Sequence, residues 1–281
     1  MADDNFKILI KPKTGWRDID FAELWRYREL MFMFVKRNFA TRYKQTILGP
    51  AWLIISPLMN TIISTFVFGT IAGIPSEGVP YFLFYMCGYT AWNYFSSCLV
   101  ATSSTFTGNA AIFGKVYFPR LVMPVATVCT SFFDYLIQFF LFIAFWLYFL
   151  VQGAEVALTG FVWLIPIMLI QMAALGLGCG IIISSLTTKY RDLTVLVSFG
   201  VSLWMYITPV IYAVSSLPEK IKALCMLNPM APIIEMMRYA LLGTGEIPVF
   251  YWGISVVTTT VILAIGVILF SKVEKTFIDT V

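Results

Sequence analysis

The side chains that carry out most catalysis and metal binding are scarce in this sequence. It contains no histidine, which removes the commonest metal ligand and the usual proton shuttle near neutral pH. Its five cysteines are odd in number, widely spaced and mostly within apolar runs, so they indicate packing and not a disulfide framework or a metal site. We therefore expect no catalytic residue and no bound metal in this chain.

One glycine-containing segment resembles a phosphate-binding loop only in part. Residues 108–116 have the sequence GNAAIFGKV, with five residues between the glycines where such a loop has four. Val116 also stands where Ser or Thr would bind magnesium. We predict that this segment is not a nucleotide site. If the protein uses ATP, another subunit must bind the ATP and its magnesium ion.

Asp134 is the one acidic residue deep within an apolar run. A charge at that depth in a membrane is costly and points by default to a function. Against this, a single carboxylate with no base or histidine relay near it makes a poor proton pathway. We favour a structural role, in which Asp134 bonds a neighbouring helix or is protonated, and direct transport chemistry is the alternative.

Four aromatic residues are spaced to share one face of a helix. They are Tyr81, Tyr85, Tyr89 and Trp92, at positions i, i+4, i+8 and i+11. Further rings of this kind occur at Trp204, Tyr206 and Tyr212. Tyr and Trp combine a flat apolar face with a hydrogen-bonding tip, which suits carbohydrate. We predict that these rings line a channel, and an aromatic belt at the membrane surface is the alternative.

The composition indicates which elements must position these residues. Apolar residues make up 59% of the 281 residues and charged residues only 12%, a balance that indicates a bilayer as the solvent. A hydrocarbon core of about 30 Å requires about 20 apolar residues of a helix. We predict an all-α integral membrane protein in which residues 50–281 form six transmembrane helices, at 51–73, 81–105, 121–150, 161–186, 193–213 and 250–271.

The basic residues are distributed very unevenly between the two sides of that arrangement. All but three of the 19 fall in 1–49, in the connections after the second and fourth spans, or after the sixth. Positive charge is retained in the cytoplasm, so both termini are predicted to be cytoplasmic and 214–249 to face the exterior. Residues 1–20 contain many charges and no apolar core of the kind a secretory signal has, so we expect no cleavage there.

The N-terminal region, residues 1–49, contains a segment that alternates apolar and basic side chains. Within 22–46, Trp25, Phe34 and Phe39 are interleaved with Arg28, Lys36 and other bases. This pattern is typical of an amphipathic helix at the cytoplasmic surface, with aromatic rings among the headgroups and bases toward anionic lipid. A plain basic flank that only fixes the topology is the alternative.

The exterior segment 214–249 is too polar to span a membrane, yet it carries apolar pieces at 221–227 and 233–242. These are separated and bounded by Pro218, Pro229, Pro232, Gly243 and Gly245. The pattern predicts two short re-entrant helices near a pore mouth, because irregular backbone at membrane depth needs protein or water around it. An ordinary exterior loop is the alternative.

Small residues recur at helix-packing intervals in two places. They are clustered at 69–73 (GTIAG) and 176–180 (GLGCG). Such spacing allows helices to approach closely. We interpret both clusters as packing sites within one chain in preference to a dimer contact.

Five segments of the sequence stand out as motifs, and in chain order they are RYKQTILGPAW (42–52), GKVYFPRLVMP (114–124), KYRDL (189–193), TPVIY (208–212) and LNPMAPIIEMMRYALLG (227–243). In this combination and order they resemble the permease subunits of ABC transporters that export O-antigen and related polysaccharides, the ABC-2 type exporters. The resemblance extends through nearly the whole chain.

The resemblance implies a homodimer of six-helix permeases in the bacterial inner membrane, docked on two cytoplasmic ATP-binding subunits. ATP, magnesium and hydrolysis would belong to those subunits, and a lipid-linked glycan would pass outward through a channel. No nucleic acid is implied. The implied ATPase contact is Gly114, Lys115, Val116, Tyr117, Phe118, Pro119 and Arg120. Teichoic acid or capsular polysaccharide is the alternative cargo, and a membrane enzyme such as a glycan acyltransferase is the alternative class of protein.

Overall fold

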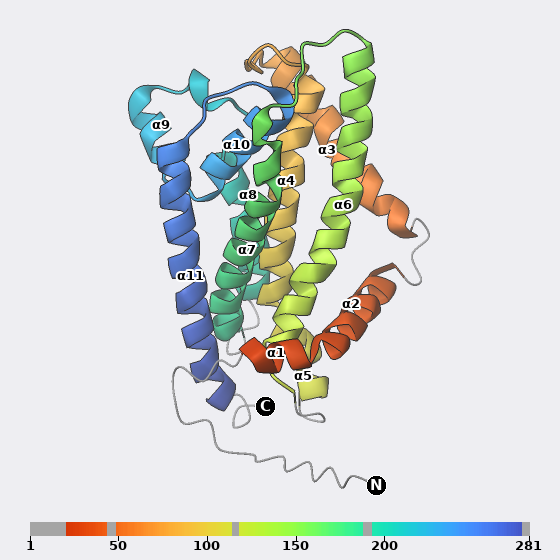
Figure 1. Cartoon of the computed structure of the whole chain (residues 1–281), viewed down its shortest axis with the longest axis vertical. Coiled ribbons are helices and arrows are strands. Elements are labelled where there is room, and N and C mark those ends of the chain that lie inside the picture. The colour runs from red at the N-terminus through yellow and green to blue at the C-terminus, as the bar shows by residue number, and fades with distance from the viewer. Residues whose placement is uncertain (1–20, 44–48, 114–117, 188–192, 277–281) are drawn as a thin grey trace, which may run out of the picture.

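The structure, a computed structural model, describes residues 21–43, 49–113, 118–187 and 193–276, and these contain helices and no strand (Figure 1). The elements are α1 (Phe21–Arg26), α2 (Arg28–Tyr43), η1 (Gly49–Ala51), α3 (Trp52–Ser64), η2 (Thr65–Ile71), α4 (Tyr81–Ser103), α5 (Thr105–Phe113), α6 (Val122–Val151), η3 (Gly160–Leu164), α7 (Ile165–Thr187), α8 (Leu193–Ile207), η4 (Val214–Ser216), α9 (Glu219–Met226), α10 (Met230–Leu242) and α11 (Val249–Thr276).

Four stretches of helix are long and apolar enough to cross a membrane. They are Gly49–Ile71, Val122–Val151, Gly160–Leu186 and Val249–Phe270. They correspond to the first, third, fourth and sixth predicted spans. The protein is therefore a multi-pass, all-helical membrane protein.

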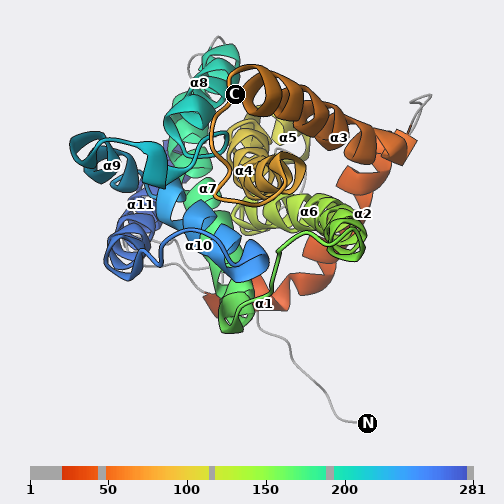
Figure 2. The ribbon, with the colours of Figure 1, turned by 90° about the horizontal axis from the view of Figure 1, so that it is seen from above.

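The second predicted span, α4, has 23 residues but is less apolar than those four stretches because it lies inside the bundle. Figure 2 shows α4 surrounded by α3, α6, α7, α8 and α10, all of which contact it. Every residue from Leu83 to Trp92 is buried. A helix enclosed by other helices can carry polar and aromatic side chains that lipid would not accept.

The fifth predicted span, 193–213, is shorter than expected. Helix α8 ends at Ile207 because Thr208 precedes Pro209, and the residue before a proline disfavours helical backbone. Its 15 residues rise only about 22 Å at about 1.5 Å per residue, less than a hydrocarbon core of about 30 Å. The chain from Thr208 to Ala213 forms a turn instead of a last helical turn.

Glycines of α7 allow it to fit between α4 and α11. A Cβ at Gly176 would lie 2.6 Å from Cys98 Cβ in α4, and one at Gly178 would lie 2.9 Å from Leu263 Cα in α11. Gly266 of α11 in turn approaches the carbonyl of Gly178. The predicted packing of this cluster within the chain is confirmed. Gly69, in the other cluster, also lies against a ring of the same chain, that of Tyr81.

Helix α2 lies across α6 at the end of the bundle where α5 is found (Figure 1). Its Leu30, Met31 and Phe34 pack on a small core that contains Phe118. Other apolar side chains point outward, and Phe32 is 67% exposed. The helix therefore lacks the single apolar face that the amphipathic prediction implies, because one apolar set is used to hold it against α6.

The opposite end of the bundle carries α9 and α10 (Figures 1 and 2). The two short helices predicted within 214–249 are present, with Pro218 before α9 and Pro229 before α10. Helix α10 ends at Gly243, whose φ of 74° is the left-handed conformation that favours glycine at this position. Most of α10 is buried against α4, α7 and α11, so an ordinary surface loop does not describe this segment.

The close contact between α4 and α7 gives a test of the fold. We expect Gly176→Ala to cost about 1–3 kcal/mol because the new methyl group overlaps Cys98 and the backbone of α4. The matched control is Gly253→Ala in α11, where no heavy atom lies within 4 Å of the new Cβ. Thermal unfolding of the purified protein should show a lower midpoint for the first variant only, and equal midpoints would contradict this packing.

Candidate functional site

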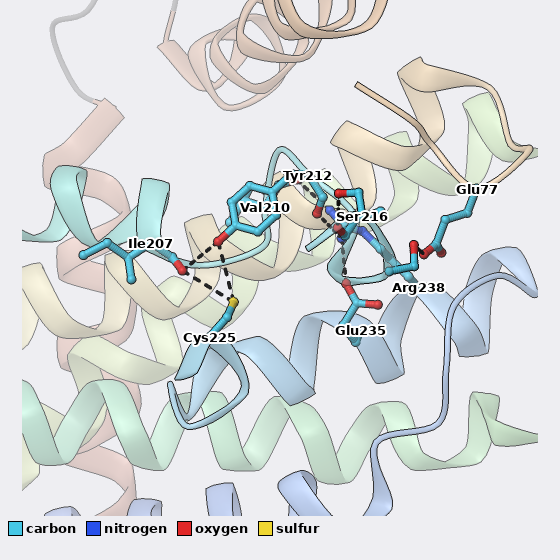
Figure 3. A network of polar contacts seen from close by, with 10 residues as sticks. Glu77, Ile207, Val210, Tyr212, Ser216, Cys225, Glu235 and Arg238 are labelled. Carbon is cyan, nitrogen blue, oxygen red and sulfur yellow. Dashed lines mark hydrogen bonds and ion pairs between the residues drawn. The ribbon is translucent and has the colours of Figure 1, made fainter. Parts of the chain in front are cut away.

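A buried arginine joins the short helix α10 to the rest of the bundle. The guanidinium of Arg238 is fully buried and donates hydrogen bonds to the carbonyl of Val210 at 2.6 Å and that of Tyr212 at 3.3 Å (Figure 3). It also pairs with Glu235, one helical turn earlier, at 3.0 Å. The ring of Phe84 in α4 lies 3.7 Å from the guanidinium carbon. The arginine thus holds three separate segments together.

The space for this guanidinium depends on a glycine in α4. A Cβ at Gly88 would lie 2.9 Å from Arg238 Nη2 and 2.7 Å from the carbonyl oxygen of Val210. These distances are shorter than real Cβ contacts, so a larger residue at this position would displace one of the two groups. Gly88, Val210 and Arg238 therefore form one close-packed unit.

A second set of hydrogen bonds connects the end of α8 to the turn between α9 and α10. Asn228 donates to the hydroxyl of Thr208 at 2.7 Å, and its side-chain oxygen accepts from Trp204 Nε1 at 3.2 Å. The hydroxyl of Tyr212 donates back to the carbonyl of Ile207 at 2.8 Å (Figure 3). The end of α8 and the α9–α10 segment are therefore fixed to each other, and we call this assembly the α8–α10 lock.

Acidic side chains gather on the outer side of the lock. Glu77, from the connection between η2 and α4, and Glu235 both approach Gly245, where a Cβ would lie 3.4 Å from the first carboxylate and 3.2 Å from the second. Burial raises the pKa of Glu235 to about 7 against the opposing charge of Arg238, and Glu77 adds to the rise. This rise brings the titration of Glu235 toward neutral pH.

At the opposite end of the bundle, two arginines of α2 bind the helices beside it. Arg42 forms an ion pair with Asp134 of α6, whose side chain is only 6% exposed. Arg37 donates to the side-chain oxygen of Asn109 in α5 at 2.8 Å and lies over the ring of Phe34. Asp134 thus bonds a neighbouring helix. Its partner is α2, which the sequence did not identify.

The predicted aromatic stripe lies mostly inside the single chain. Tyr85, Tyr89 and Trp92 are 0%, 7% and 3% exposed. Tyr89 shares a hydrogen bond of 2.8 Å with Ser64 of α3, and Trp92 packs edge-on against Trp204 of α8. In one chain these rings connect α4 to its neighbours. The prediction that these rings line a channel refers to a channel formed by two copies of the chain. A single chain does not test it, so it stays a prediction.

The later rings of that prediction are placed differently from one another. Trp204 and Tyr212 are half-buried parts of the lock, whereas Tyr206 is 55% exposed. Tyr206 follows Ser202 and Ser198 at intervals of four residues, and all three are exposed on α8. We call this row the α8 polar stripe. Tyr81, at the start of α4, is half-buried.

The predicted ATPase contact is described only in part. Residues 114–117 lie outside the described residues. Phe118 is buried against Phe34 of α2, with ring centroids 5.5 Å apart, and Pro119 and Arg120 follow just before α6. The described part of this segment therefore touches the helix that also binds Asp134.

In the part of the chain that the structure describes, no group of three or more acidic or cysteine side chains has an arrangement that could hold a metal ion. Residues 108–113, the beginning of the segment that partly resembles a phosphate-binding loop, belong to helix α5. The backbone of α5 is kinked at Asn109, where φ is −122° and ψ is 15°.

These features define a helical membrane protein with a locked pair of short helices at one end and a surface helix at the other. The chain belongs to the ABC-2 type transporter family, whose sequence model matches residues 29–242. It is 30% identical over 251 residues to the O-antigen export system permease protein RfbA of Klebsiella pneumoniae, an alignment covering 89% of this chain and 94% of the relative.

Two further relatives carry the same description. A second Klebsiella pneumoniae permease is 29% identical over 251 residues, with the same coverage of both chains. The permease of Myxococcus xanthus is 26% identical over 216 residues, which cover 75% of this chain and 80% of the relative. The chain is therefore a membrane permease component of a transporter.

The sequence did not identify the Glu235–Arg238 pair as a site, since the segment 214–249 was assigned to the exterior without regard to pairing between its charges. One signal was available. The two opposite charges are three residues apart within an otherwise apolar helix, a spacing at which side chains meet. A pair of that kind in an apolar segment indicates burial, because an exposed helix would have more polar residues around it.

The buried ion pair gives a prediction with an internal control. We expect Arg238→Met to cost about 3–5 kcal/mol because it leaves Glu235 buried without its partner. The double variant Arg238→Met with Glu235→Met should recover part of that loss, since an apolar pair leaves no buried charge. Lys222→Met breaks the more exposed pair with Glu246 and should cost less than about 1 kcal/mol. Thermal unfolding of the purified proteins measures all three, and equal losses in the two single variants would contradict the lock.

The raised pKa of Glu235 gives a prediction about pH. The folded protein keeps a proton on Glu235 that the unfolded chain releases above a pKa of about 4.5, so this contribution to stability falls as the pH rises from about 4.5 to about 7. Unfolding midpoints measured at about pH 5 and about pH 8 should therefore fall more for the wild type than for Glu235→Gln. Parallel pH profiles of the two proteins would show that Glu235 is not the group that titrates.

Proposed function

We propose that the protein is the permease of an ATP-driven exporter that moves lipid-linked O-antigen polysaccharide across the bacterial inner membrane. Two copies would form the channel, and two cytoplasmic ATP-binding subunits would bind ATP and magnesium. The family supports the transporter class. The three relatives, each described as an O-antigen export permease, support the choice of cargo over teichoic acid or capsular polysaccharide.

The α8 polar stripe is the observation that best supports a channel between two copies. Ser198, Ser202 and Tyr206 are exposed along a helix whose other exposed residues, such as Leu196 and Phe199, are apolar. The Ser202 hydroxyl donates to the Ser198 carbonyl within α8, and the row still gives this face more hydrogen-bonding capacity than the apolar residues beside it, which suits water or a partner surface better than lipid. A second copy that brings its own stripe opposite this one would create a polar path, with Tyr206 as part of its lining.

The topology proposed from charge agrees with the placement of the elements. The α2–α5 end carries Arg26, Arg28, Lys36, Arg37 and Arg42, which favours the cytoplasm for this end. The described chain also begins and ends there, at α1 and the end of α11 (Figure 1). With α4 and α8 as the second and fifth crossings, the bundle would have six spans, cytoplasmic termini and an exterior α8–α10 lock.

The α2–α5 end also supplies a mechanical connection for a motor subunit. A push on residues 114–120 would reach α2 through the contact between Phe118 and Phe34. Helix α2 would pass it to α6 through Arg42 and Asp134, and to α3, which follows α2 in the chain. Residues 114–120 therefore fit the role of ATPase contact, with this path converting ATP binding into movement of the helices.

Two measurements test the proposed function. Deletion of the gene in its host should remove the surface polysaccharide and leave lipid-linked glycan inside the cell, and an unchanged surface would reject the export role. The purified permease should hydrolyse no ATP alone, and it should stimulate its ATP-binding partner when the two are reconstituted together. ATPase activity of the permease by itself would contradict the division between conduit and motor.

A further inference from the structure

A polar cavity opens at membrane depth between α3, α4 and α6. Its volume is about 540 Å³, within the range of about 300–1,000 Å³ that small-molecule sites occupy. Asn93 is 12 residues into α4, and Gln138 is 16 residues into the 30-residue α6, so both lie near the middle of their helices. The cavity is separate from the α8 polar stripe and from the lock.

Three helices each contribute a polar pair to this cavity at a spacing of one turn. The pairs are Ser56 and Asn60 on α3, Asn93 and Ser97 on α4, and Asp134 and Gln138 on α6. Residues four apart lie on the same face of a helix, so each helix turns one polar face toward the same space. Polar groups at this depth are costly in lipid and indicate water or a polar ligand.

The chemistry of the lining selects a neutral ligand with many hydroxyl groups. Among the described lining residues, the two charged ones, Arg42 and Asp134, pair with each other. The remaining polar groups are amides and hydroxyls, which both donate and accept hydrogen bonds as sugar hydroxyls do. Trp52, also on the lining and 56% exposed, adds a flat apolar face of the kind that packs on a sugar ring.

We propose that this cavity binds a neutral sugar unit of the transported glycan within each protomer. The proposal rests on the proposed function and adds a specific site to it. Asn60 is exposed and would meet the sugar directly, whereas Asn93 and Gln138 already share a hydrogen bond of 3.1 Å and would orient each other's free groups. The site would hold the chain beside the path lined by α8.

The first test uses the full exporter in cells and N-ethylmaleimide as the probe. The thiol of Asn60→Cys should react because it lies in a polar cavity, whereas that of Ile62→Cys, 50% exposed on the same helix but outside the cavity lining, should react far more slowly. Labelling of Asn60→Cys is then compared in two strains, one blocked in glycan synthesis and one that makes the glycan but has an ATPase partner unable to hydrolyse ATP.

We expect the glycan to slow labelling of Asn60→Cys by about fivefold, as for a site occupied about four-fifths of the time. Equal labelling rates in the two strains would overturn the sugar site. The gene deletion reports separately on export itself, so loss of surface glycan on deletion together with equal labelling would leave the proposed function standing and remove only this site.

A second variant tests the site without the cysteine introduced at position 60, so that the result does not depend on an effect of that substitution. Asn93→Leu with Gln138→Leu replaces a polar pair by an apolar one of similar size, which a bilayer accepts, so the protein should be present in normal amounts. We expect its export rate to fall by about fivefold, the effect of a lost hydrogen bond. Thr260→Val, on an exposed face of α11, is the control and should export normally. Normal export by the double variant would overturn the proposal.

Discussion

The burial of one guanidinium in an apolar bundle sets the arrangement of the α9–α10 end. An unpaired charge at the position of Arg238 would cost several kcal/mol, so the structure must supply acceptors from every side. Glu235, the carbonyls of Val210 and Tyr212 and the ring of Phe84 do so for the two terminal nitrogens and the face of the guanidinium, whereas the buried Nε has no hydrogen-bond partner among the described residues. Because these groups belong to α10, to the turn after α8 and to α4, none of those elements can move without exposing the charge.

The end of α8, which the Thr208–Pro209 sequence sets, is what allows this burial. A longer α8 would direct its last carbonyls along its own axis, where they could not accept hydrogen bonds from Arg238. The Thr208–Pro209 break frees the carbonyl of Val210 for the guanidinium and lets Thr208 bind Asn228. The early end of α8 is therefore a condition for the lock. A rigid exterior end leaves the α2–α5 end, with its partly exposed Arg42, as the place where a motor subunit can move the bundle.

The sequence predicted the helical membrane class, four of the spans, the pair of short helices and the packing of the glycine cluster, because each depends on local properties. Apolar run length sets a span, proline and glycine end a helix, and a missing side chain allows close approach. The aromatic stripe was identified correctly as one face of α4, but the burial of Tyr85 and Trp92 depends on helices distant in the sequence. The spacing of residues predicts which of them share a helix face, but it does not predict whether that face contacts another helix, lipid or water.

By itself the sequence determined that this chain lies in a bilayer and which side chains share a helix face, since these follow from hydropathy and helical periodicity, whereas the early end of α8 at Ile207 was not predicted. Only the tertiary structure decided the partners of the charges: Arg42 for Asp134, and the α8 turn for Arg238. Arg42 is 92 residues from Asp134 and Val210 is 28 residues from Arg238, and no local pattern encodes contacts at those separations. Burial makes each of these contacts important for the arrangement of the helices, because it removes the water that would otherwise solvate the charges.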